Sequence, residues 1–260
     1  MTRKTNFLFA IGFILVLFIV WELVATFVDI TFVIPHPIPT FKTFSKLLFN
    51  SSEIRPNLHF WSIVGSSLLR IFLGLAIGIT VGILLAVFAI KFPALQSGIQ
   101  IYIGIIKATP VASFILILWF ITSGELVPIG IALLMVCPIV YQNLLSGYFD
   151  LEKEKRELLD VFHVPFFTRF KIFVLPGLLK YLFPGIISAT GLAWKSGIAA
   201  EIIAYTKNSI GREISNAKNI LEGELLFALT IAVILISLIF EYGLKYLERR
   251  ILRGRISERL

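Results

Sequence analysis

Residues 150–180 read DLEKEKRELLDVFHVPFFTRFKIFVLPGLLK, a charged stretch that separates two long apolar parts of the chain. Leu151, Leu158 and Phe162 repeat at helical spacing, and acidic residues occupy much of the remaining helix surface. Pro165 cannot continue this helix, because it lacks an N–H and its ring restricts the residue before it. The stretch therefore predicts two short helices with a bend between them, the second of which ends at residues 175–177.

The composition around this stretch is that of a membrane protein. Of the 260 residues, 57% are hydrophobic and only 15% are charged, whereas a soluble domain has about 25% charged residues. Because a membrane-spanning helix needs roughly 20 apolar residues, the chain has room for roughly five to seven spans and for no separate soluble enzyme domain. The net charge of +8 comes from basic residues that cluster in loops and at the C-terminus. This pattern favours cytoplasmic loops over nucleic-acid binding.

Six apolar segments have the length of a membrane span. They cover about residues 7–27, 63–88, 101–121, 126–145, 181–205 and 225–246. We therefore expect an all-α polytopic membrane protein with a single domain over residues 1–260 and a cytoplasmic loop over residues 150–180. The basic residues of that loop and of the C-terminal tail place both chain ends in the cytoplasm. The first span could instead be a secretory signal, although Trp21-Glu22 stands where a cleavage site needs small residues.

A proline-rich segment over residues 34–50 precedes the second span. Its alternating prolines predict an extended start, and the apolar residues that follow recur at helical spacing. We expect a short amphipathic helix at the outer membrane interface, and an ordinary extracytoplasmic loop is the alternative.

Lys107, Lys195 and Glu201 fall inside the apolar segments. Each costs a few kcal/mol at the bilayer centre, roughly 2.5–3.5 kcal/mol on insertion scales, so such residues usually face a cavity or a partner. In one interpretation, the two lysines line a translocation path that favours an anionic or polar solute. In the other, one of them pairs with Glu201 across spans or extends to the interface.

Small residues in the second span predict close helix packing. Gly74, Gly78 and Gly82 repeat every four residues and form a flat stripe that another helix can approach. In the third span, Pro110 is expected to remove one helical hydrogen bond close to Lys107.

Motifs for chemistry are absent from the sequence. The segment GLAWKS at residues 191–196 lacks the second glycine of a phosphate-binding loop, and it lies inside a span. Neither HExxH nor Gly-x-Ser-x-Gly occurs, and the three histidines are scattered. We therefore expect no catalytic residues, no metal site and no cofactor bound by this chain.

The loop also carries a recognisable spacing. Glu157 is followed six residues later by His163, and Leu175-Pro176 come twelve and thirteen residues after His163. Together with IKATPVASFILILWF at 106–120, GLAWKSGIAAEIIA at 191–204 and SIGREISNAK at 209–218, this spacing resembles the permease subunits of ABC importers of the nitrate/sulfonate/taurine type. In that family a Gly stands where this chain has His163. We predict a bend with positive φ at this residue, which costs a non-glycine residue roughly 1–2 kcal/mol.

The resemblance implies the ABC importer permease fold, with about six transmembrane helices and a cytoplasmic coupling loop. It implies a homodimer in the bacterial inner membrane, ABC ATPase subunits in the cytoplasm and a solute-binding protein outside. ATP and Mg would bind to the ATPase. Its surface groove would hold the first loop helix, with Glu157 and Asp160 facing basic groups. A solvated loop with local ion pairs is the alternative interpretation of these acids.

The resulting functional hypothesis is an ATP-driven importer subunit that translocates a small polar or anionic solute. The family suggests sulfonates, nitrate or taurine, and related permeases carry pyrimidines. The alternative is a secondary transporter or channel that works without ATP, which predicts an inverted repeat.

Overall fold

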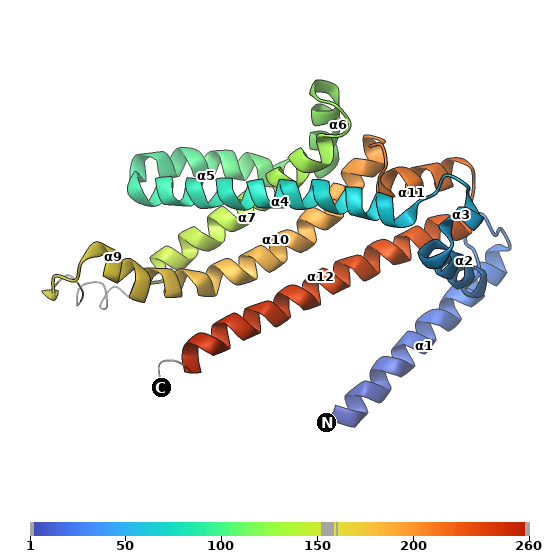
Figure 1. Ribbon diagram of the computed structural model, residues 1–260, viewed down its shortest axis with the longest axis horizontal. Coiled ribbons are helices and arrows are strands. Elements are labelled where there is room, and N and C mark those ends of the chain that lie inside the picture. The colour runs from blue at the N-terminus through green and yellow to red at the C-terminus, as the bar shows by residue number, and fades with distance from the viewer. Residues whose placement is uncertain (1–2, 152–158, 160, 258–260) are drawn as a thin grey trace. The chain divides into compact units, whose positions relative to one another are not determined.

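The computed structural model describes residues 3–151, 159 and 161–257, and every regular element in this part of the chain is a helix (Figure 1). In chain order they are α1 (Arg3–Val28), α2 (Pro37–Phe49), α3 (Ser51–Ile54), α4 (Phe60–Lys91), α5 (Pro93–Ala108), α6 (Val111–Ile121), α7 (Val127–Phe149), α9 (Phe166–Arg169), the π-helical turn η1 (Phe170–Val174), α10 (Leu175–Ile203), α11 (Ile210–Asn219) and α12 (Gly223–Ser257). Five helices are long and apolar enough to cross a membrane, and the bent pair α5–α6 would make a sixth span. The all-α membrane class predicted from the sequence is therefore confirmed.

Residue contacts group the chain into two compact units. The first consists of Met1–Ser66 and Asn208–Leu235, and the second of Ser67–Lys207 and Ile236–Leu260. The long helices α4 and α12 contribute residues to both. Lys107, Lys195 and Glu201 all belong to the second unit.

The first unit contains the short helix predicted after the first span. Helix α2 begins at Pro37, where a proline is well tolerated because the first helical N–H has no partner within the helix. Thr40 and Leu47 form its buried face. Nearby, the guanidinium of Arg55 donates from Nη1 to Glu213 Oε2 at 3.3 Å and from Nη2 to Glu222 Oε2 at 2.5 Å. This fork joins the segment after α3 to α11 and to the start of α12.

In the second unit, the glycine stripe of α4 lies directly against α7. A Cβ atom on Gly78 would lie 2.8 Å from Cβ of Val136, and one on Gly82 would lie 2.9 Å from Cβ of Val140. At Gly74 an added Cβ would meet the backbone oxygen of Ile129. Any side chain on this stripe would therefore push the two helices apart.

The third predicted span is not one helix. The sequence predicts a single span over residues 101–121, whereas the structure has α5 and α6, bent by 99° at the break. Thr109 has extended backbone angles (φ −79°, ψ 130°) because the Pro110 ring disfavours helical geometry in the residue before it. The buried Ile115 of α6 then packs in a cluster with Val127 and Ala200, which holds α6 against α7 and α10.

The helix after the charged loop does not end at residues 175–177 as predicted. Helix α9 continues through η1 into α10 (Figure 1), and residues from Phe167 to Ile203 form one 37-residue apolar helix. The backbone N–H of Leu175 donates to the oxygen of Phe170, a wider turn than the α-helical one. Pro176 is therefore accommodated within a continuous helix rather than at its end.

Candidate functional site

Lys107 makes a polar contact across two helices of the second unit. Its Nζ lies 2.9 Å from Oε1 of Gln142. Helix α5 packs on α7 and buries Ile103 and Ile106. Lys107, one residue further along α5, and Gln142 are both exposed, at the edge of this interface. A lysine ammonium can only donate, so it must meet the carbonyl oxygen of the Gln142 amide.

Two cavities share this pair of residues. The larger has a volume of about 530 Å³ and the second about 360 Å³, and Lys107 and Gln142 line both. The larger is also lined by Gln100, Ile103, Gly104, Tyr141, Leu145 and Ser146. The second is also lined by Ile106, Thr109, Val111, Leu134, Met135, Pro138, Ile139, Asn143 and Leu192. None of these lining residues is acidic, so Lys107 supplies the only formal charge among them.

Tyr141 is a buried residue that lines the larger cavity. The residue is 0% exposed, and its hydroxyl has no hydrogen-bond partner among the described residues. The sequence analysis missed Tyr141 and Gln142, because both are uncharged residues inside an apolar span. The run Tyr141-Gln142-Asn143 was the available signal, since three consecutive polar side chains are unusual in a lipid-facing helix.

Glu201 and Lys195 lie elsewhere in the second unit. Glu201 on α10 is fully buried and accepts a hydrogen bond of 2.8 Å from the Ser67 hydroxyl on α4. Lys195 is exposed, interacts electrostatically with Glu241 on α12, and lines neither cavity beside Lys107. The structure thus brings Lys107 to Gln142 and Glu201 to Ser67.

The predicted coupling residues are described only in part. Glu157 and Asp160 lie outside the described residues. His163 is exposed in a turn with φ 48°, so the predicted bend with positive φ is present at this residue. Leu175 and Pro176 open α10, where Gly177 leaves room for the side chain of Leu151. This contact joins the start of the loop to its end.

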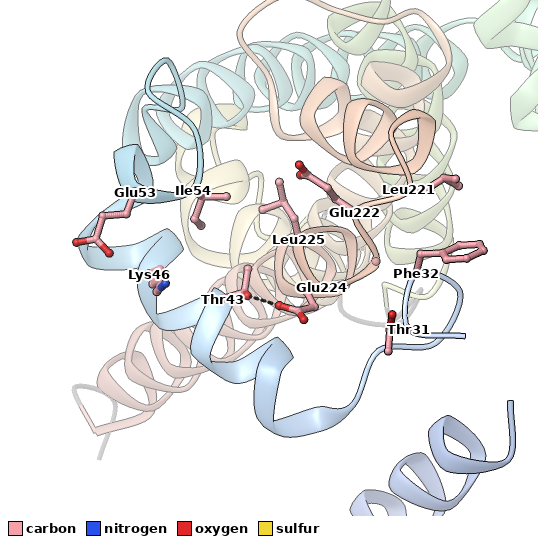
Figure 2. Close-up of a pocket in the computed structure, with 11 residues that line it drawn as sticks. Thr31, Phe32, Thr43, Lys46, Glu53, Ile54, Leu221, Glu222, Glu224 and Leu225 are labelled. Carbon is pink, nitrogen blue, oxygen red and sulfur yellow. Dashed lines mark hydrogen bonds between the residues drawn. The ribbon is translucent and has the colours of Figure 1, made fainter. Parts of the chain in front are cut away.

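A third cavity, of about 330 Å³, belongs to the first unit. Figure 2 shows Thr43 of α2 beside Glu224, with a hydrogen bond of 2.9 Å from the hydroxyl to Oε2. Three glutamates and Lys46 line this cavity, so it differs in charge from the two beside Lys107. Within the described ranges, no group of histidine, cysteine and acidic residues could hold a metal ion.

These helices and their polar contacts define a polytopic membrane protein with polar cavities between its helices. Residues 78–253 match the family described as the binding-protein-dependent transport system inner membrane component, and the chain belongs to this family. Its resemblance to ABC importer permeases is thereby confirmed, and the chain is a permease of an ABC transport system.

Two curated relatives match nearly the whole chain. The taurine transport system permease protein TauC of Escherichia coli (strain K12) is 24% identical over 93% of this chain and 88% of its own length. The putative aliphatic sulfonates transport permease protein SsuC of Bacillus subtilis (strain 168) is 23% identical over 86% of this chain and 79% of its own.

A solved structure supports the fold. The crystal structure of an amino acid ABC transporter with histidines superposes with a TM-score of 0.65, at 15% sequence identity, over 78% of this chain and 98% of the solved chain. At 15% identity this match supports the fold alone, and the fold is that of an ABC transporter permease.

Proposed function

We propose that this permease imports a small organic sulfonate or a related anion, driven by ATP. The observation that carries the proposal is the similarity, over most of the chain, to two permeases named for taurine and aliphatic sulfonates. The charge of the cavities beside Lys107 supports it, because a cationic side chain among neutral polar groups favours an anion.

The same proposal assigns partners to the two sides of the membrane. A cytoplasmic ABC ATPase binds ATP and Mg and holds the loop over residues 150–180, where Glu157 and Asp160 face basic groups of the ATPase. A soluble binding protein delivers the solute from outside. Two copies of the permease form the pathway, and both chain ends lie in the cytoplasm, in line with the basic residues of the loop and the tail.

Reconstitution tests this function directly. The permease is co-purified with the ATPase and inserted into proteoliposomes with the binding protein, and uptake of radiolabelled taurine is measured with ATP or with a non-hydrolysable analogue. We expect uptake only with hydrolysable ATP. Equal uptake without ATP would instead support a secondary transporter, and no taurine or ethanesulfonate uptake in either condition would refute the proposed solute class.

A further inference from the structure

We propose that the groove between α5 and α7 faces a second copy of this chain, and that a water-filled path runs between the two copies. The inference rests on the two-copy pathway proposed above, and it identifies which face of the chain forms that pathway. Three observations carry it: the polar side chains of the groove, the break between α5 and α6, and the contrasting face of α4.

The groove carries exposed polar side chains within segments that are otherwise apolar. It has a volume of about 530 Å³, and its exposed polar residues are Gln100 and Lys107 on α5 and Gln142 and Ser146 on α7. The spacing within each pair places both of its members on one face of their helix. Hydrocarbon offers these groups no hydrogen bonds, and a lysine in a span faces either the protein interior or a water-filled cavity. The exposed groove is therefore unsuited to lipid.

The break between α5 and α6 opens beside the same groove. It lies near the middle of the apolar segment over residues 93–121, where α6 turns away from the line of α5 (Figure 1). Both Thr109 and Pro110 have extended backbone angles, and Thr109 lines the second cavity, which adjoins the groove. Irregular backbone at membrane depth is found where protein covers it or where it lines a water-filled cavity. Because Pro110 is exposed in this chain, a further wall is needed at this position.

Helix α4 provides an internal reference for a surface that faces lipid. Between residues 69 and 88 its exposed residues are apolar except Thr80, and Leu84 and Val87 among them are 50% and 54% exposed. The Thr80 hydroxyl donates to the backbone oxygen of Ala76 at 2.9 Å, so it is satisfied within its own helix. The exposed face of α4 therefore suits hydrocarbon, whereas the groove between α5 and α7 suits water.

A second copy of the same chain provides the missing wall. Two identical subunits related by a two-fold axis present the same patch to each other, so the polar residues of both grooves would line one shared path. Closure by lipid would leave Lys107 and Gln142 against hydrocarbon, and a path enclosed within one copy would not leave them exposed. The two-copy arrangement meets both conditions.

Cysteine accessibility tests whether the groove faces water. Cys137 is the chain's only cysteine and is buried, so Cys137→Ala supplies a background without thiols. Gln100→Cys and Ser146→Cys place a thiol in the groove, and Leu84→Cys and Val87→Cys place one on α4 as controls. Each full-length variant is co-purified with the ATPase into lipid nanodiscs, where a charged thiosulfonate reaches both sides of the membrane. The groove thiols should react at least about tenfold faster, because a thiol in apolar surroundings does not ionise to the reactive thiolate.

Cross-linking with a flexible bismaleimide tests for the second copy. Two differently tagged forms of the same cysteine variant are co-expressed, and a covalent product that carries both tags identifies a pair of permeases. Gln100→Cys and Ser146→Cys should give this product, whereas Val87→Cys on the lipid-facing side should not.

The inference is overturned if the groove thiols react with the charged reagent no faster than those on α4, since the groove then faces lipid. Fast reaction without a doubly tagged product would reject the second copy as the wall. Neither measurement needs solute, binding protein or ATP hydrolysis, so a failure of sulfonate uptake would leave this inference standing. Sulfonate uptake with unreactive groove thiols would reject the inference and leave the proposed function intact.

Discussion

Ser67 donates a hydrogen bond of 2.8 Å from Oγ to Oε2 of Glu201, and both residues are fully buried. The contact joins α4 to α10, two helices that belong to different parts of the sequence. A buried carboxyl group depends on such donors, because it has lost the water that would otherwise solvate it.

Ser67→Ala is expected to lower the free energy of unfolding by about 1–3 kcal/mol, because it removes a donor from a buried carboxyl group. The measurement is thermal or denaturant unfolding in detergent. Thr80→Ala is the control, since the exposed Thr80 hydroxyl on the same helix bonds to the backbone oxygen of Ala76, and its effect should stay within about 0.5 kcal/mol. Equal losses of unfolding free energy in the two variants would show that the hydrogen bond from Ser67 to Glu201 does not stabilise the protein.

Gly78→Ala is expected to destabilise the protein by about 1–3 kcal/mol, because the added methyl would lie 2.8 Å from Cβ of Val136 and force α4 away from α7. Gly65→Ala on the same helix is the matched control. No atom lies within 4 Å of a Cβ added there, so it should be neutral or stabilise by up to about 1 kcal/mol through helix propensity. Unfolding curves of both variants check the prediction, and similar stabilities would show that the stripe tolerates side chains.

His163→Val is expected to impair the loop, because a β-branched residue is strained at the φ of 48° that His163 adopts. His163→Gly should be tolerated, since glycine adopts positive φ without steric cost. Limited proteolysis and ATP-dependent uptake measure the two variants, with Thr168→Val in α9 as a control in right-handed helix. Equal behaviour of the valine and glycine variants would mean that the bend does not depend on this residue.

Arg55→Lys is expected to destabilise the first unit by on the order of 1 kcal/mol, because a single ammonium cannot reproduce the fork to Glu213 and Glu222. The groups are partly exposed, so salt should screen the interaction. The difference in melting temperature between variant and wild type should therefore shrink at high ionic strength. A difference that is independent of salt would point to packing of the arginine stem instead.

Helix positions follow closely from the sequence, because apolar length and proline placement act locally. Pro110 predicts the loss of one helical hydrogen bond but not the 99° bend. The direction of α6 after the bend is set by the packing of the buried Ile115 against residues that are distant in sequence. Pro176 suggests a helix end, but the wider π-turn directly before it keeps the helix continuous through this residue.

The site is less accessible to sequence reasoning than the fold. The cost of a charge in lipid singles out Lys107, Lys195 and Glu201, and composition alone gives no partner for any of them. The contacts to Gln142 and Ser67 depend on which helix faces meet, and those faces are set by the packing of neutral residues. A lysine in an apolar span does predict a polar residue on a neighbouring span, and Gln142 is such a residue.

The uninterrupted passage from α9 through η1 into α10 has a mechanical consequence. A helix of 37 residues is about 55 Å long at a rise of about 1.5 Å per residue. The helix is continuous from residues of the loop over 150–180 to the part that carries Glu201, so a displacement of the loop can be transmitted along it. A small tilt at the turn of His163 would therefore displace the far end of this helix by a larger distance.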